Sequence, residues 1–407
     1  MGVFSHARFR WLAIARTTGF LGNAIAPIAL SFAVLDLGGS VTDLGIVVGA
    51  RSIANIALLL VGGVLADRWP RALLLQGSSA LAAATSALMA VSVLAGFASV
   101  PLLAGIGLVN GAVAAIALPA SYSITPETVP AENLQQANAI LRIGTNSAAI
   151  VGAPLGGLLA ATAGPGWAMV VIAAAFAVEA TCYVRVGGTR TERARSHMLT
   201  ELREGWSEFF SRRWVWVVVL QFMVVNAAFV GGEQVLGPVI ADETFGRAAW
   251  GVALASQTAG AVVGGLVAAR WLPRRALLFG VVLVTMEAAP LLALGLSPHL
   301  VVLLPAMFLC GIALEQFTIA WDLSLQENVP SDKLARVYSY DMIGSYVAVP
   351  VGQLAVGPVA AVAGPAATLV GSAVLIVVVT AAALTSRQVR ELRRVSRSPE
   401  PTPADQA

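Results

Sequence analysis

The sequence is poor in charged residues. Asp, Glu, Lys and Arg make up 12% of its 407 residues, whereas soluble domains carry about a quarter. Hydrophobic residues reach 57%, and a water-soluble particle of this size cannot bury so much apolar surface. The composition therefore predicts an integral membrane protein. The formal net charge of +3 is too small to indicate a nucleic-acid partner, and we expect none.

Cysteine and histidine are also scarce. Cys182 and Cys310 lie in apolar stretches, and His6, His197 and His299 lie far apart. These residues provide neither a disulfide framework nor metal-ligand spacing, so we expect no metal site. The apolar stretches hold no set of nucleophile, histidine and acid, and the phosphate loop GxxxxGK[ST] does not occur. We therefore expect no enzyme, no cofactor and no ATP-driven transport.

Long apolar runs are abundant. A helix needs about 20 apolar residues to cross a bilayer, and twelve stretches satisfy this requirement. The first is too long for a signal peptide and lacks a cleavage site, so we expect it to be retained. The predicted spans lie near residues 11–35, 43–65, 72–96, 101–120, 137–160, 165–184, 214–240, 248–270, 275–296, 299–322, 336–361 and 365–386.

The arginines predict the orientation. Nearly all of the Lys and Arg residues fall in segments that this topology places inside. The exceptions are Arg247 in an outer loop and Arg16, Arg51 and Arg142 within spans. By the positive-inside rule, both termini are cytoplasmic and the protein is a multi-pass protein of the inner or plasma membrane.

The chain contains an internal repeat. Residues 126–140, PETVPAENLQQANAI, are similar to residues 326–340, QENVPSDKLARVYSY. Residues 62–75, GGVLADRWPRALLL, are similar to residues 264–279, GGLVAARWLPRRALLF. The repeat predicts two six-helix halves in the same orientation, with a substrate site between them near the membrane midplane.

The repeat divides the chain into four parts. The N-terminal half spans residues 1–186 and the C-terminal half spans 213–386. Between them, residues 187–212 form a cytoplasmic linker whose apolar residues recur at helical spacing, which predicts an amphipathic helix on the membrane surface. Residues 387–407 are expected to form a basic, disordered cytoplasmic tail.

These motifs resemble a known family. Residues 63–71, GVLADRWPR, resemble the signature G-x-L-A-D-R-x-x-R of the major facilitator superfamily, and lie between the second and third spans as in that family. The residue patterns of the first span and of the loop between spans four and five are similar to those of the bacterial drug, macrolide and siderophore exporter branch. The resemblance implies an all-α membrane fold of twelve helices in two pseudo-symmetric halves.

The signature residues are expected to form a conformational latch. By analogy with the superfamily, Asp67, Arg68 and Arg71 would meet Asp341 at the inner end of the eleventh span in the outward-facing state. Gly63 would allow the helices to approach closely. The alternative interpretation is a topology signal with scattered surface charges.

The fifth span carries a second motif. Gly152, Pro154, Gly156 and Gly157 resemble the antiporter signature G-P-x-x-G-G, with the proline displaced by one position. We expect them to kink the helix and permit close packing. This packing would either close a leak path, as in exporters, or be ordinary small-residue packing.

Charged side chains inside spans are costly, so each is a candidate site. In the superfamily, spans one, four, seven and ten line the cavity, so Glu315 and Glu233 should face it. We expect Glu315 to carry the proton, with Glu233 as the next candidate and Arg51 as a counter-charge. Arg16 and Glu287 are further charge candidates. A permanently paired structural role is the alternative for each.

A few polar residues are expected to line the cavity, in a wall that is otherwise apolar. They are Asn23, Asn55, Asn110, Asn226, Gln234, Gln316 and Tyr346. Such a wall suits a lipophilic or amphiphilic organic molecule.

The sequence therefore predicts a monomeric, proton-coupled exporter of a small organic substrate that works by alternating access in the lipid bilayer. An importer or facilitator of a small metabolite, or a membrane sensor that does not translocate, remains the alternative.

Overall fold

The computed structural model describes residues 3–187, 209–271 and 273–394. The regular elements in these ranges are all helices, and twelve of the helices are long and apolar enough to cross a membrane. This confirms the predicted all-helical membrane fold. Helices satisfy every backbone donor and acceptor within one segment, which the hydrocarbon core of a bilayer requires.

The N-terminal half packs as a bundle in which α1 contacts α5 and α6, α2 contacts α4, and α3 contacts α6. Its elements are η1 (Val3–Ser5), α1 (Ala7–Asp36), α2 (Val41–Arg68), α3 (Arg71–Leu94), α4 (Val100–Ser123), η2 (Thr125–Glu127), η3 (Ala131–Asn133), α5 (Leu134–Thr162) and α6 (Pro165–Val186).

The C-terminal half has the same number of spans, but three of them are interrupted. The seventh is broken by the π-helical turn η4, the ninth by the 3₁₀ turn η5, and the eleventh between α14 and α15. Its elements are α8 (Arg213–Gly231), η4 (Gly232–Leu236), α9 (Gly237–Glu243), α10 (Arg247–Arg270), α11 (Ala276–Leu283), η5 (Val284–Glu287), α12 (Ala288–Leu296), α13 (Leu300–Asn328), α14 (Ser331–Tyr346), α15 (Val349–Ala363), α16 (Pro365–Leu384) and α17 (Arg387–Glu391).

The two halves share a turn that precedes their last span. Gly164 has φ +92° and ψ 160°, and Gly364 has φ +87° and ψ 151°. Each is followed by a proline at the first helical position, Pro165 and Pro365. Glycine is required because a side chain is strained at this φ, and proline is favoured because its fixed φ suits a helix start.

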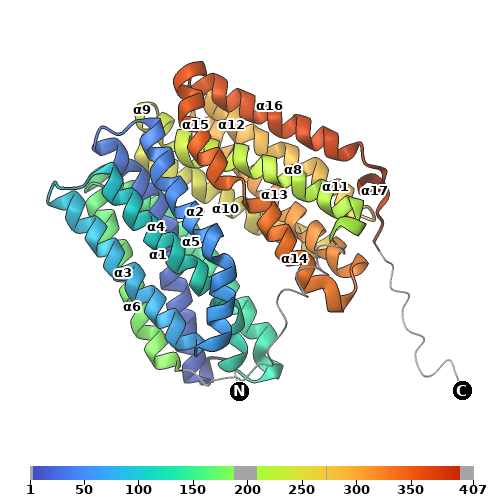
Figure 1. The fold of residues 1–407 in the computed structure, drawn as a ribbon, viewed down its shortest axis with the longest axis horizontal. Helices are drawn as coiled ribbons and strands as arrows, with labels where there is room; N and C mark the ends of the chain where they lie inside the picture. The colour runs from blue at the N-terminus through green and yellow to red at the C-terminus, as the bar shows by residue number, and fades with distance from the viewer. Residues whose placement is uncertain (1–2, 188–208, 272, 395–407) are drawn as a thin grey trace, which may run out of the picture.

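The halves meet at one end of the molecule and diverge toward the other, where α1 begins (Figure 1). Across the halves, α2 packs on α15 and α5 packs on α10. The α2–α15 contact is close where α2 begins, because a Cβ added at Gly45 would overlap the carbonyl oxygen of Gln353. We call this the closed end, and the opposite end the open end.

The predicted linker and tail are only partly within the described residues. Most of the linker, residues 188–208, lies outside them, including most of the proposed amphipathic helix. The prediction of disorder is wrong for the start of the tail, because Arg387–Glu391 forms the short helix α17. Val389 is fully buried there, and this apolar contact orders the turn.

Candidate functional site: two cavities and their charged residues

A cavity of about 390 Å³ lies between the halves. Its walls come from α1, α2 and α4 on one side, and from η4, α14 and α15 on the other. We call it the central cavity. Its polar lining residues are Ser31, Arg51, Ser52, Asn55, Gln234 and Tyr346, and the rest of its lining is apolar. A volume of this size is typical of sites for small organic molecules.

A second cavity, of about 320 Å³, lies within the N-terminal half between α1, α2, α3, α4 and α6. We call it the N-half cavity. Leu30, Arg51 and Leu118 line both cavities, so the two spaces adjoin at these side chains. Much of its remaining wall is apolar and includes Met89 and Phe176.

The structure brings five of the seven predicted cavity residues to these spaces. Asn23 and Asn110 line the N-half cavity, and Asn55, Gln234 and Tyr346 line the central cavity. The other two line neither cavity. Gln316 is buried and donates to the Gly264 carbonyl at 2.9 Å, while Asn226 donates to the Ser345 carbonyl at 2.9 Å. Both side chains join helices within the C-terminal half instead.

Arg16 lies at an acidic residue that the sequence analysis did not select. Arg16 and Glu179 both line the N-half cavity, and Arg16 interacts electrostatically with the Glu179 carboxylate. The side chains of Ser79 and Tyr183 also face that carboxylate. Gly19 provides the space, because an added Cβ would overlap the Glu179 carboxylate. The signal in the sequence was an acid within the predicted sixth span, residues 165–184.

Glu315 forms an ion pair across the two halves. Arg142 of α5 donates from Nη2 to Glu315 Oε1 of α13 at 3.0 Å. The Arg142 side chain is 72% exposed and that of Glu315 is 20% exposed, so the described part of the chain does not enclose this pair. The partner of Glu315 is therefore Arg142, and not Arg51 as the sequence analysis expected.

Glu233 and Glu287 lie together inside the C-terminal half. The expectation that Glu233 faces the cavity is wrong, because its neighbour Gln234 lines the central cavity while Glu233 is buried against α10. Gln257 lies beside Glu233, and Glu287 is close enough to interact with it electrostatically. The π-helical turn shifts the helical register, which a sequence read at 3.6 residues per turn does not show.

A charged clamp joins the halves at the closed end. Arg247, at the start of α10, donates from Nη2 to Asp36 of α1 and from Nε to Asp242, each at 2.6 Å. The Arg247 guanidinium carbon also lies 4.9 Å from the centre of the Phe32 ring, a cation–π distance. The sequence singled out Arg247 only as a cation of an outer loop, and its acidic partners were missed.

The fifth-span motif packs at the same end. An added Cβ at Gly152 would lie 2.7 Å from that of Ala24 in α1, and one at Gly157 would lie 2.5 Å from the Arg247 carbonyl oxygen. Gly156 faces Ile25, and α5 continues as one helix through Pro154. The motif thus brings α5 against α1 and α10, which is the close packing that both interpretations required.

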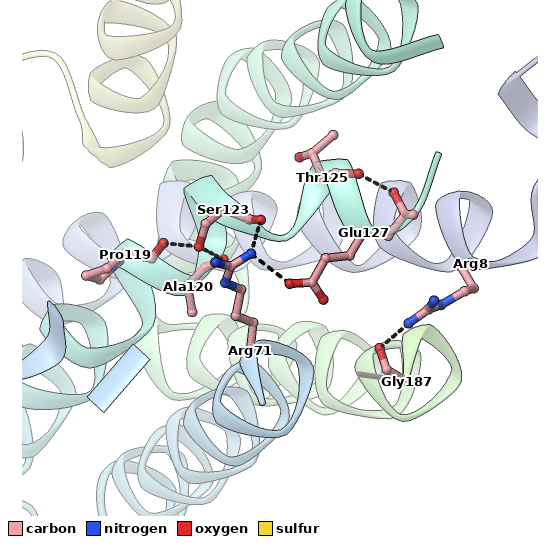
Figure 2. A network of polar contacts seen from close by, with 9 residues as sticks. Arg8, Arg71, Pro119, Ala120, Ser123, Thr125, Glu127 and Gly187 are labelled. Atoms are coloured by element: carbon pink, nitrogen blue, oxygen red, sulfur yellow. Dashed lines mark hydrogen bonds and ion pairs between the residues drawn. The ribbon is translucent and has the colours of Figure 1, made fainter. Parts of the chain in front are cut away.

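The signature loop lies at the open end. Arg71 donates to the Ser123 carbonyl at 2.8 Å and to Glu127 Oε1 at 2.7 Å, both in its own half (Figure 2). Asp341 accepts hydrogen bonds from Trp321 at 2.9 Å and from Ser345 at 3.1 Å in the other half. The surroundings of Gly63 and the side chains of Asp67 and Arg68 lie outside the described part of the chain.

The family follows from the sequence as a whole. Residues 12–353 match the model of the Major Facilitator Superfamily. The chain belongs to this superfamily. It is a transporter and not an enzyme, and it is a multi-pass membrane protein.

The curated relatives include two kinds of exporter. The chain is 26% identical to the multidrug efflux pump Tap of Mycolicibacterium fortuitum, over 94% of this chain and 96% of that protein. It is also 30% identical to the enterobactin exporter EntS of Citrobacter koseri, over 40% of this chain and 39% of that protein. The predicted resemblance to the drug and siderophore exporter branch is thereby confirmed.

Solved structures share the fold at low sequence identity. The nucleoside transporter NupG superposes with a TM-score of 0.74 at 14% identity, covering 95% of this chain and all of that one. A bacterial homologue of the human lysosomal transporter Spinster, described as inward-facing and unoccupied, gives a TM-score of 0.72 at 15% identity. That alignment covers 96% of this chain and 98% of the other.

Proposed function

We propose that the protein is a proton-coupled exporter that moves a lipophilic or amphiphilic organic molecule by alternating access. The observation that carries this proposal is the central cavity between two halves whose described helices pack closely at one end and diverge toward the other (Figure 1). The exporters Tap and EntS support the direction of transport. Their named substrates, drugs and a siderophore, support an organic molecule with apolar parts.

The orientation of the chain gives the proposal its direction. With both termini in the cytoplasm of the cell, as the arginine distribution predicts, the open end faces inward. The structure is then an inward-facing state that loads substrate from the cytoplasm. Closing the open end and separating the clamp at Arg247 would produce the outward-facing state.

The ion pair of Arg142 and Glu315 supplies a physical route to proton coupling. A protonated Glu315 no longer attracts Arg142, so proton binding weakens a contact between the halves. The described part of the chain does not enclose the pair, which leaves a path by which a proton would enter and leave it. Proton binding and release would therefore bias the equilibrium between the two states.

The latch belongs to the opposite state in this proposal. Arg71 would exchange Glu127 for Asp341 when the open end closes, with Asp67 and Arg68 beside it. Asp67→Asn should therefore slow transport while substrate binding and folding persist. Transport rates in liposomes, set against binding by the same protein, measure this, and an unchanged rate would remove the latch from the mechanism.

The exporter proposal is tested with purified protein in liposomes that contain a pH-sensitive dye. The liposomes are exposed to a panel of antibiotics, dyes and siderophores. We expect compound-dependent proton movement that is absent from protein-free liposomes. Folded protein that moves compounds without protons would be a facilitator, and binding without any movement would indicate a sensor.

A further inference from the structure

Among its described lining residues, the central cavity has one charged group, and no acid of the described chain pairs with it. Of the described residues that line this cavity, Arg51 alone is charged. Its Nη2 donates to Asn23 Oδ1 at 3.3 Å. No carboxylate in the described part of the chain forms an ion pair with it. A guanidinium in such surroundings lacks the anion that normally offsets the cost of removing it from water.

The other two arginines inside spans differ in this respect. Arg142 is paired with Glu315, and Arg16 lies beside Glu179. In both cases the charge is balanced by an acid of the chain itself. Arg51 is the exception among the three, and it stands where the central cavity and the N-half cavity adjoin.

The backbone at Arg51 is held firmly. A Cβ added at Gly111 of α4 would overlap the carbonyl oxygen of Arg51, so α2 and α4 touch at this point. Asn55, one turn along α2, donates to the Gly111 carbonyl at 3.4 Å. The helix contact thus fixes the base of the Arg51 side chain, while its guanidinium lines the cavities.

We propose that Arg51 binds an anionic group of the transported molecule, so that the substrates are amphiphilic organic anions. This inference rests on the proposed transport function and specifies its substrate class. The planar guanidinium donates two parallel hydrogen bonds to a carboxylate, sulfonate or similar group. The apolar body of the molecule lies against the wall formed by Pro27, Met342, Ile343 and Val349.

The central cavity offers further polar groups near this anchor. Gln234 and Asn55 line the same space from opposite halves. An anion held at Arg51 therefore lies within a cavity whose walls belong to both halves. The cavity contains no acid among its described lining residues that would repel the anion.

The test uses two fluorescent probes that differ in charge. 8-Anilinonaphthalene-1-sulfonate carries one sulfonate, and N-phenyl-1-naphthylamine has the same aromatic skeleton without it. The affinity of each is measured by fluorescence titration of the purified protein in nanodiscs, with the signal of empty nanodiscs subtracted. The variants are Arg51→Gln, Arg51→Lys and the control Arg387→Gln, whose side chain is 85% exposed outside both cavities.

We expect Arg51→Gln to weaken sulfonate binding about tenfold or more, since a charge-assisted hydrogen bond is lost. The affinity for the neutral probe should change less than about twofold, and Arg387→Gln should change neither. Arg51→Lys should weaken the binding of the sulfonate probe to an intermediate extent and leave the affinity for the neutral probe unchanged. An equal change for both probes, or an unchanged sulfonate affinity, would overturn the inference. If Arg51→Gln does not fold, Arg51→Lys decides by the same criterion.

The same probes separate this inference from the exporter proposal. Sulfonate binding that depends on Arg51 without proton-coupled movement in liposomes would support the anion site and reject proton-coupled export. Proton-coupled movement of neutral or cationic compounds that is unaffected by Arg51→Gln would reject the anion site and support export.

Discussion

Three arginines within the spans show how surroundings determine the role of a residue. Arg142 joins the halves through Glu315, and Arg16 lies by Glu179 inside one half. Arg51 lines the central cavity, whose described lining residues include no acid. The residue type is the same in each case. The difference comes from what the neighbouring helices place beside the guanidinium.

Glu315→Gln should abolish pH-driven transport and leave substrate exchange intact. Glutamine keeps the size of the side chain but cannot bind or release a proton, so the contact with Arg142 no longer depends on pH. Flux driven by a pH gradient and exchange without a gradient measure the two properties in one liposome preparation. Glu391→Gln is the control, because Glu391 is an acid of the short helix α17 whose side chain is 67% exposed and lines neither cavity. Retained pH-driven flux in Glu315→Gln would make Glu315 structural.

Gly19→Ala should lower stability by about 1–2 kcal/mol, because the added methyl overlaps the Glu179 carboxylate. In a Glu179→Ala background the overlap is absent, and alanine at position 19 should be neutral or stabilising, since it favours helix. Thermal unfolding of the four proteins in detergent measures this double-mutant cycle. Equal effects of Gly19→Ala in both backgrounds would show that the two residues do not interact.

The candidate residues were predicted where a simple helical face was sufficient. Asn23, Asn55 and Asn110 lie on cavity-facing sides of regular helices, as expected. Glu233 was misplaced because the π-helical turn rotates it away from the cavity and brings Gln234 there. Asp36 was missed because an ion pair between two helix ends that are far apart in the chain leaves no local pattern in a single sequence.

At the scale of helices, the closed end is held by glycine packing and by one clamp. Asp36→Asn removes the arm that crosses between the halves, whereas Asp242→Asn removes only the arm within the C-terminal half. These carboxylates are partly exposed, so each arm contributes about 0.5–1 kcal/mol. Asp36→Asn should therefore raise the proportion of molecules open at this end about two- to fivefold.

The measurement uses spin labels at Leu37→Cys and Glu243→Cys, both exposed near the clamp. Cys182 and Cys310 are buried and free, so they are replaced by alanine first. A longer distance between the two labels in Asp36→Asn, with little change in Asp242→Asn, would show that the ion pair between the halves helps to hold this end closed. Equal distance distributions in the two variants would show that the glycine packing alone holds this end closed.

The twelve spans were predictable because each needs one long run of apolar residues, and such a run is visible directly in the sequence. The interruptions within them were not. The helices α11 and α12 on either side of η5 are apolar, and neither glycine nor proline lies in the turn Val284–Glu287. A local change of helix type of this kind depends on packing against neighbouring helices, which one sequence does not contain.

For the whole molecule, the arginine distribution predicts that the open end faces the cytoplasm. A membrane-impermeant maleimide should label Leu37→Cys in intact cells, but label Arg390→Cys only after the cells are opened. Both sites are exposed, and the alanine background at Cys182 and Cys310 removes other thiols. The reverse labelling pattern would invert the orientation and with it the direction of the proposed cycle.

The arrangement of two halves was predictable from the repeat, but the state of the molecule was not. The same residues must pack in at least two ways during alternating access, so the sequence alone does not select which end is closed. The packing of Gly45 on Gln353 and of Gly157 on Arg247, together with the ion pair of Asp36 with Arg247, identifies the closed end.

The turns at Gly164 and Gly364 provide an internal standard for comparing the two halves. Both have nearly the same backbone angles, and in both the space around an added Cβ is empty to 4 Å. A side chain placed at either position therefore meets a backbone penalty of the same size and no steric one. If the same substitution at Gly164 and at Gly364 changes the free energy of unfolding by different amounts, the difference measures how firmly each half holds its last helix. One half then serves as the reference for the other.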